Sequence, residues 1–183
     1  MNSGFVTSRT GRPLAALRTT AVIAAGLLTA ATAQAQDTEL GQWIAGWSDG
    51  GHWRVASSPA TLHFRYSPEH RQVWALALER QRLDGWLLGA SRFNNSFGQP
   101  SAYLYVGRRW PGLWGQDPLY GQVSAGMMYG YRGQFEDKVP LNNNGFSPGA
   151  LVTLGWQFNR KASVAAHLLG DAGLMLQFSW DLR

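Results

Sequence analysis

Apolar and polar side chains alternate along most of the chain from residue 61 to its end. Between residues 61 and 66, a leucine and two aromatic residues share one face, and Thr61, His63 and Arg65 share the other. Large and small side chains alternate in the same way between residues 73 and 78. Successive residues of a strand point to opposite faces, so this pattern predicts strands with one apolar and one polar face. It predicts eight of them, at residues 61–66, 73–78, 86–93, 102–110, 119–131, 150–158, 163–169 and 174–182.

The segments between these predicted strands are rich in Gly, Pro, Asn and Asp, which are the residues that turns favour. No apolar run is long enough for a helical membrane span, and no helical periodicity persists. Short alternating strands with Trp and Tyr near their ends predict an all-β protein, an eight-stranded antiparallel transmembrane β-barrel. A water-soluble lipocalin-like or sandwich protein is the alternative. It is disfavoured because small residues at predicted interior positions, namely Gly89, Ala125, Gly126 and Gly155, would fill a soluble core poorly.

The N-terminal residues have the three parts of a secretory signal. Arg9, Arg12 and Arg18 precede a modestly apolar stretch at residues 19–31, and the small residues Ala33-Gln34-Ala35 follow it. This order predicts a signal peptide at residues 1–35 that is cleaved during export, and the mature chain then begins at Gln36. A retained N-terminal membrane anchor is the alternative reading of the same segment.

The mature chain divides into two parts by composition. Residues 36–58 form an N-terminal segment that would lie in the periplasm, and residues 59–183 form the predicted barrel. The glycines at positions 41, 46, 50 and 51 make the first part a poor helix by propensity. Its tryptophans would instead lie along the inner membrane surface as an irregular anchor.

Composition removes several classes of chemistry. The chain has no cysteine, which excludes disulfides, thiolate metal sites and cysteine nucleophiles. No metal-ligand spacing occurs, so we expect neither a metal nor a cofactor. Three of the 16 basic residues lie in the predicted signal, and the formal charge of the remainder falls from +5 to +2. The pI of about 10.0 is therefore no sign of nucleic-acid binding.

Polar residues gather at one predicted rim of the barrel. His63 points inward at the end of the first predicted strand, and residues 93–100 carry Asn95 and Ser96 to the same side. Such a set can transfer acyl groups, with His63 as base, Ser96 as nucleophile or oxyanion donor and Asn95 as the residue that orients the histidine. The same loop sequence also occurs in plain turns. The other histidines are predicted to be solvated, at positions 52 and 70, or interfacial, at position 167.

At these residues the sequence resembles the PagP-type lipid A palmitoyltransferases, which are eight-stranded outer-membrane enzymes. The family's first-strand pattern resembles residues 61–66 and places its essential histidine on His63. Its Phe-Lys-Asp-Ser-Trp loop resembles residues 93–97 and places its essential serine on Ser96. The glycine that limits acyl length in the family falls on Gly107. Residues 139–141, 148–156 and 178–180 are also similar to family segments in the same order.

The resemblance implies an acyltransferase that modifies lipopolysaccharide. It would move a palmitoyl chain from a phospholipid donor to lipid A, as a monomer in the outer membrane, without cofactor or nucleic-acid partner. The phospholipid would reach the interior laterally near Pro140 and Pro148, and interior glycines would keep the barrel open for its chain, which would end at Gly107. In one departure, the family's aspartate before the serine is Asn95 here. An amide can orient a histidine by hydrogen bonding but cannot stabilise an imidazolium by charge.

Two other classes of function stay open from the sequence. A barrel of this size can be a non-enzymatic lipid-binding or structural protein of the outer membrane. It can also be a solute channel, although eight strands leave little room for a continuous polar lumen.

Overall fold

The computed structural model describes residues 39–182, which fall into two units. The first unit, up to Gly46, contains helix α2 (Glu39–Ala45). The second begins at Trp47 and is a β-barrel. The signal peptide predicted at residues 1–35 lies outside the described residues. No helix in the described part of the chain has the length and apolar character needed to span a membrane.

Helix α2 corrects the expectation that residues 36–58 are a poor helix throughout. A glycine inside a helix costs only about 1 kcal/mol relative to alanine, and Gly41 is flanked by better helix formers. The helix ends at Ala45, and the following Gly46 N–H donates to the Gln42 carbonyl at 3.0 Å. Glycine is the usual residue at such a position.

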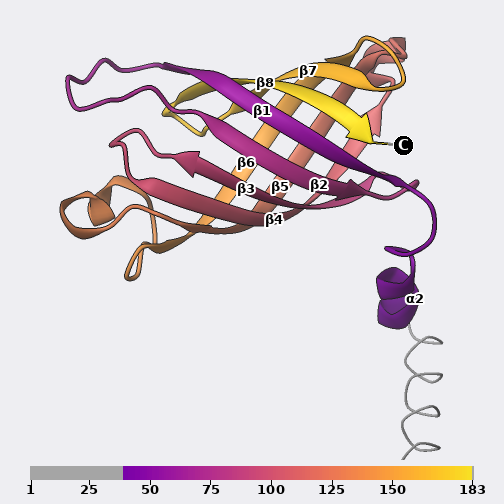
Figure 1. The fold of residues 1–183 in the computed structure, drawn as a ribbon, viewed down its shortest axis with the longest axis horizontal. Coiled ribbons are helices and arrows are strands. Elements are labelled where there is room, and N and C mark those ends of the chain that lie inside the picture. Colours follow the sequence, from indigo (N-terminus) through magenta and orange to yellow (C-terminus); the bar gives the residue numbers. More distant parts are fainter. Residues whose placement is uncertain (1–38, 183) are drawn as a thin grey trace, which may run out of the picture. The chain divides into compact units, whose positions relative to one another are not determined.

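Eight strands follow one another around a closed barrel, each antiparallel to the next, and β8 pairs with β1 (Figure 1). This confirms the predicted all-β, eight-stranded antiparallel barrel. Two short 3₁₀ helices, η1 (Leu113–Gly115) and η2 (Gly133–Lys138), lie in the connections. The strands are β1 (His52–His63), β2 (Ala75–Gln81), β3 (Trp86–Asn94), β4 (Pro100–Pro111), β5 (Leu119–Tyr129), β6 (Phe146–Gln157), β7 (Ala162–Leu168) and β8 (Gly173–Leu182).

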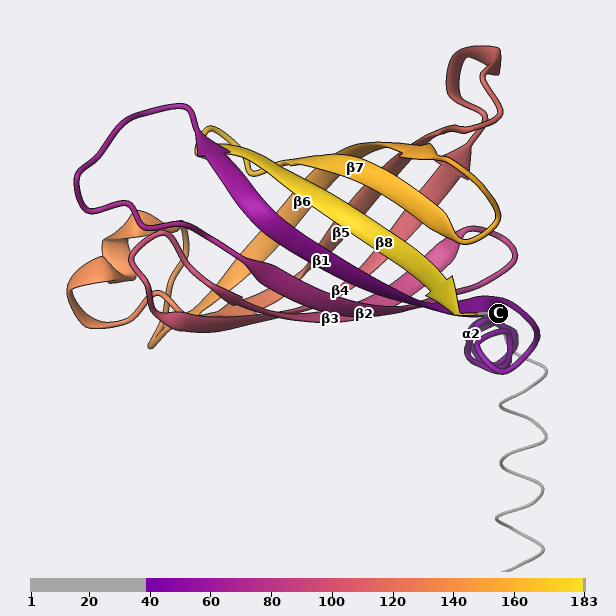
Figure 2. The ribbon, with the colours of Figure 1, turned by 45° about the horizontal axis from the view of Figure 1, so that its top comes forward.

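The two ends of the barrel differ in the length of their connections. Strand β1 finishes at one end of the barrel, which we call the His63 end. This end carries the long β1–β2 and β5–β6 connections. The opposite end, the His52 end, carries the β2–β3, β4–β5 and β6–β7 connections and the end of β8 (Figure 2).

Strand β1 begins earlier than predicted. It starts at His52, so the barrel wall includes residues assigned to the N-terminal segment, and it stops at His63, so residues 64–66 belong to a loop. The alternation before residue 59 is hard to read because its inward residues are charged or small. The register with β8 also shifts between Ser57 and Ala60, and this irregularity brackets Pro59, which lacks a backbone N–H.

The barrel has an apolar outside and a polar inside. Its exposed outward side chains include Trp53, Leu78, Leu104, Val152, Phe178 and Trp180, and its buried inward ones include Arg54, Glu79, Arg109, Gln122, His167 and Asp181. A buried charge is costly unless it is paired, so the inward charged side chains need partners inside the barrel.

The interior glycines make room for tyrosine rings. A Cβ atom added to Gly89 would lie 2.3 Å from the Tyr105 ring, and one added to Gly155 would lie 2.2 Å from the Tyr120 ring. The expectation that these glycines hold the interior open for a lipid chain is therefore wrong. Ala125, predicted to face inward, is exposed on the outside.

Charged groups inside the barrel are held by specific partners. Arg54 on β1 stands opposite Asp181 on β8, and its Nε donates to Asp181 Oδ1 at 2.5 Å. His52 Nε2 lies 3.3 Å from the other oxygen of the same carboxylate. Between β4 and β2, the Tyr105 hydroxyl donates to Glu79 Oε1 at 2.9 Å. These pairs cross between strands and so tie the barrel together from within.

Replacing Asp181 with Asn tests the importance of this pairing. The change leaves the buried Arg54 guanidinium without its anion, and breaking a buried ion pair costs about 3–5 kcal/mol. We expect the D181N barrel, refolded in detergent, to unfold at a clearly lower urea concentration than the wild type. The matched control is D171N, in the exposed β7–β8 loop, which should unfold at the wild-type concentration. Equal midpoints for all three proteins would contradict the proposed contribution of the pair.

Candidate functional site

His63 and Ser96 meet at the His63 end of the barrel. His63 is the last residue of β1, and Ser96 lies in the tight loop between β3 and β4. His63 Nε2 lies 2.9 Å from Ser96 Oγ, within hydrogen-bonding distance. The two residues are 33 positions apart in sequence, and the successive pairing of β1, β2 and β3 brings them to the same end of the barrel. The structure thus joins the two side chains that the sequence singled out as a base and a hydroxyl.

Two further residues complete the surroundings of this pair. The His70 ring lies against the His63 ring, with centroids 4.4 Å apart. Tyr131 lies near Ser96 on the other side. Burial raises the pKa of Tyr131, and the neighbouring Ser96 lowers it by a smaller amount. The phenol therefore stays protonated near neutral pH and can donate a hydrogen bond.

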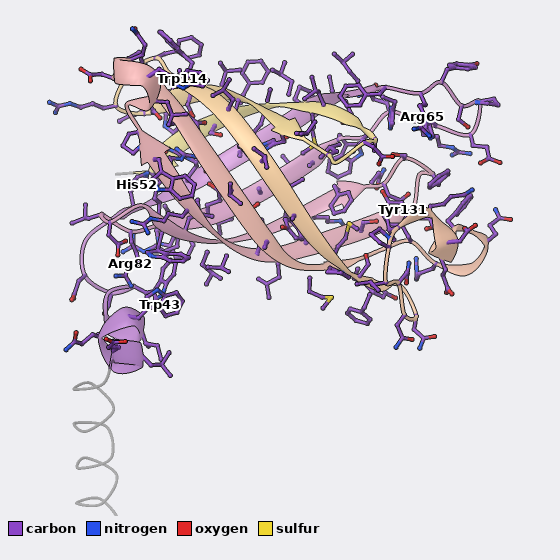
Figure 3. The ribbon with its side chains drawn as sticks, turned by 180° about the vertical axis from the view of Figure 1, so that it is seen from behind. Trp43, His52, Arg65, Arg82, Trp114 and Tyr131 are labelled. Atoms are coloured by element: carbon purple, nitrogen blue, oxygen red, sulfur yellow. The ribbon has the colours of Figure 1, made fainter. Side chains whose placement is uncertain are left out.

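The sequence did not single out His70 or Tyr131. His70 was predicted to be solvated, but it lies in the β1–β2 loop against His63, with Nδ1 buried. Tyr131 was placed in a strand, but β5 ends at Tyr129 and Tyr131 lies in the loop beyond it (Figure 3). The only available signal was their position near the ends of predicted strands at the same rim.

Asn95 supports the loop rather than the histidine. It is buried, and its Oδ1 accepts hydrogen bonds from the backbone N–H groups of Phe97 (3.0 Å) and Gln99 (2.9 Å). Its Nδ2 donates to the Gln99 side chain at 3.2 Å. The side chain therefore has its hydrogen bonds within its own loop, and the expected role of Asn95 in orienting His63 is not what this geometry provides. Asn95 acts on the site by fixing the turn that presents Ser96.

Three loops are joined around the pair. The Arg71 N–H donates to the Ser96 carbonyl at 2.8 Å, which links the β1–β2 and β3–β4 loops. The Gln99 side chain bonds both the N–H and the carbonyl of Arg132, each at 3.1 Å, which links the β5–β6 loop. Phe97 lies at the centre, stacked on Phe135 with centroids 4.3 Å apart. The catalytic candidates are thus held by contacts between loops that are distant in sequence.

The barrel wall is incomplete beside this site. Strands β1 and β2 pair only as far as Ser58 and Ala75. In the described part of the chain, residues 59–63 of β1 therefore have no neighbouring strand on the β2 side. Strands β6 and β7 pair only from Val152 and Leu168 onward, which leaves residues 146–151 of β6 in the same situation. The gap between β6 and β7 contains Pro148, one of the two prolines expected at a lateral opening. Pro140 lies outside the strands, in a turn after η2, and the gap beside Pro59 was not predicted.

Gly107 faces the interior, as expected, but no open space lies beside it. A Cβ atom there would be 2.6 Å from the Val123 carbonyl oxygen and 3.1 Å from the side chains of Leu87 and Ser124. The stacked rings of Tyr103 and Tyr105 have centroids 4.7 Å apart. Both tyrosines precede Gly107 on β4, so they lie between Gly107 and the His63 end of the barrel. This packing does not support the expected role of Gly107 as the acyl-length limit.

A small cavity remains beside the tyrosine pair. Its volume is about 30 Å³, which is room for a water molecule or two. Polar groups of Glu79, Gln122, His167 and Gln177 line part of it. His167 is therefore an interior residue, with Nδ1 2.7 Å from the Thr153 hydroxyl, and not the interfacial residue that was expected. His52, expected to be solvated, lies in β1 beside Asp181 at the other end.

The arrangement at the His63 end is suited to acyl transfer. A neutral imidazole can accept the Ser96 proton at Nε2 as the serine oxygen becomes a nucleophile. The Tyr131 hydroxyl can donate a hydrogen bond to negative charge that develops beside Ser96.

Within the described residues no group of three or more His, Asp or Glu side chains is gathered as metal ligands would be. In comparisons with known proteins, no family model and no curated protein matches this chain.

Exchange of loop amides tests the role assigned to Asn95. In N95A the Phe97 and Gln99 N–H groups lose their acceptor, which is worth about 1 kcal/mol for each hydrogen bond. We expect both amides to exchange with solvent roughly fivefold faster. N95D keeps the acceptor oxygen and should exchange close to the wild-type rate. The Gly145 amide, held at 2.9 Å by Asn142 in another loop, is the internal control. The assignment would be wrong if N95A left all three amides unchanged.

Proposed function

We propose that this chain is a lipid A acyltransferase of the outer membrane, which moves an acyl chain from a phospholipid to a lipid A hydroxyl. The observation that carries the proposal is the 2.9 Å contact between His63 Nε2 and Ser96 Oγ. The resemblance to the PagP-type enzymes predicted this pair from two separate segments. A structural role alone does not require a base and a hydroxyl at one rim, flanked by a protonated phenol.

The outer surface of the barrel supports a membrane location. Large apolar side chains are exposed around the wall, and tryptophans lie near the strand ends at the His52 end, namely Trp53, Trp110, Trp156 and Trp180. An apolar band flanked by aromatic residues is the surface that a bilayer requires of a β-barrel. The His63 end would then face outward, because the chain enters the barrel at the His52 end.

The gaps in the wall support lateral access of a lipid to the site. A phospholipid in the outer leaflet has its ester near the depth of the barrel rim, where residues 59–63 and 146–151 lack a neighbouring strand on one side. An acyl chain can pass between strands there without breaking backbone hydrogen bonds. The gap at residues 59–63 ends directly at His63.

The positions of the polar atoms support a two-step reaction. Ser96 Oγ attacks the phospholipid ester carbonyl while His63 Nε2 takes its proton, and the Tyr131 hydroxyl donates to the oxyanion. The ester C–O bond breaks, the lysophospholipid oxygen receives the proton from His63, and the acyl group remains on Ser96. A lipid A hydroxyl then gives its proton to His63 and attacks the acyl-serine carbonyl. The bond between Ser96 Oγ and the acyl carbon breaks, and His63 returns the proton to Ser96 Oγ.

The interior packing bears on which acyl chain is used. Tyr103 and Tyr105 fill the barrel between the rim and Gly107, and Leu87 is fully buried beside them. Apolar side chains of Phe93, Met128 and Leu151 pack around this cluster. We therefore place the floor of the acyl site at the tyrosine pair rather than at Gly107, which corresponds to a chain shorter than palmitoyl.

Filled interior space disfavours the channel. The charged and tyrosine side chains that cross the interior, together with a cavity of only about 30 Å³ at mid-barrel, leave no wide lumen in the part of the barrel described. A non-enzymatic barrel is the remaining alternative, and the activity assay below separates it from an enzyme.

Removing either side chain of the pair should abolish activity. With purified protein, phospholipid and lipid A in mixed micelles, we expect the wild type to add one acyl chain to lipid A, detected by mass spectrometry. H63A and S96A should be slower by about 100-fold or more, since general-base catalysis alone contributes that much. S67A, in the same β1–β2 loop but with its hydroxyl bonded to the Glu69 N–H, is the matched control and should remain active.

Folding of each variant is checked by heat-modifiable migration on gels. If folded H63A and S96A acylate like the wild type, the site is wrong. If the wild type itself adds no mass, the protein is a non-enzymatic barrel.

The tyrosine pair gives a separate prediction on acyl length. Gly107 lies two residues beyond Tyr105 on β4, or about 7 Å along the strand. Y105A should open this depth and shift the preferred donor toward longer acyl chains, read from the mass added to lipid A with donors of graded length. Y105F keeps the ring and loses only the bond to Glu79, so it should keep the wild-type preference. If Y105F shifts the preference as far as Y105A does, the ring is not the floor.

A further inference from the structure

A second cavity opens at the His52 end, away from His63 and Ser96. Its volume is about 410 Å³, within the range of small-molecule sites. Its lining includes His52, Arg54, Arg109, Asp117, Tyr120 and Asp181. Neither His63 nor Ser96 lines this cavity, so the acyl-transfer chemistry does not account for it.

Arg109 is a buried cation whose contacts are all neutral. Its side chain points into the barrel from β4, and the residue is only 5% exposed. Its Nε and Nη2 both donate to Gln122 Oε1, at 3.0 and 2.7 Å, and the guanidinium lies 4.0 Å from the centre of the Tyr120 ring. No carboxylate of the described residues forms an ion pair with it. A buried charge without a counter-ion is costly, so this position favours an anion in the cavity.

Arg54 contributes a second donor to the same cavity. The residue is 1% exposed, and its Nε is committed to Asp181, but its Nη1 is buried with no hydrogen-bond partner among the described residues. Arg54 and Arg109 stand on β1 and β4, which are not neighbouring strands, so their guanidinium groups approach the cavity from different parts of the wall.

The carboxylates around the cavity do not cancel this charge. Asp181 is paired with Arg54 and His52, and Asp84 is paired with Arg82 at 2.8 Å. Asp117 is exposed in the β4–β5 connection. Among the described residues, Arg109 therefore contributes a buried positive charge without a counter-ion to the lining of the cavity.

We propose that this cavity binds a phosphate group, held between the guanidinium groups of Arg109 and Arg54. Arginine presents donors in a fork that matches phosphate oxygens, and a tetrahedral dianion can accept from two guanidinium groups that approach from different directions. The volume also accommodates a small polar group attached to the phosphate. The ligand is either free phosphate or the phosphorylated headgroup of a lipid.

Calorimetry on the full barrel refolded in detergent tests the site. Inorganic phosphate and glycerol 3-phosphate are titrated separately, with sodium chloride at equal ionic strength as the background. We expect saturable binding of phosphate by the wild type and at least tenfold weaker binding by R109Q. R160Q, which removes an exposed arginine in the β6–β7 turn at the same end, should bind like the wild type. Tighter binding of glycerol 3-phosphate than of phosphate would identify a headgroup, and equal binding would identify the free ion.

A second variant guards against a folding defect in R109Q. R109K keeps a cation at the position but loses the planar fork, so it should fold and bind phosphate several-fold more weakly than the wild type. The proposal is overturned if the wild type shows no binding beyond the chloride background. It is equally overturned if folded R109Q or R109K binds phosphate as the wild type does. Acyl transfer at the His63 end can fail or succeed independently of these outcomes.

Discussion

The barrel closes where β1 pairs with β8, and the rest of the structure depends on this closure. Across the seam, Arg54 stands opposite Asp181, and His52 contacts the same carboxylate. A closed ring of eight antiparallel strands has no free edge and encloses a narrow interior. Inward side chains must therefore fit closely against their neighbours. The tyrosine rings that lie over Gly89 and Gly155 are one result, and the pairing of Glu79 with Tyr105 is another.

Strand order also places the candidate site. His63 ends β1, and Ser96 lies in the β3–β4 loop at the same end of the barrel, so the successive pairing of β1, β2 and β3 brings the two side chains close together. The loops add what the strands lack. Asn95 holds the turn, Phe97 packs among aromatic rings, and Tyr131 reaches Ser96 from a third loop. A rigid wall with a few interlocked loops is a common way to hold catalytic groups in place.

The two ends of the barrel are chemically different, and the packed middle separates them. The His63 end has imidazoles, a hydroxyl and a phenol beside gaps in the wall, which suit a neutral ester carried by a lipid. The His52 end has buried arginines around a cavity, which suit an anion. Stacked tyrosines and polar pairs between them leave a cavity of only about 30 Å³, so no wide lumen joins the two ends in the described part of the barrel.

Local pattern was enough to predict the architecture, because alternation depends only on neighbouring residues, and it placed His63, Asn95 and Ser96 at one rim. It failed at the start of β1, where inward charges and Pro59 hide the alternation, and at α2, where a helix forms although it contains Gly41. The roles of individual residues depended on contacts that alternation does not specify. Asn95 forms its hydrogen bonds within its own loop, and Leu87 packs against Gly107. His70 lies against His63 because the β1–β2 loop folds back on the end of β1, and Arg109 meets Gln122 and Tyr120 through the register of β4 with β5. The sequence by itself determined which face of each strand is polar. Only the tertiary structure decided which polar groups meet, because those distances are set by strand register and closure of the ring.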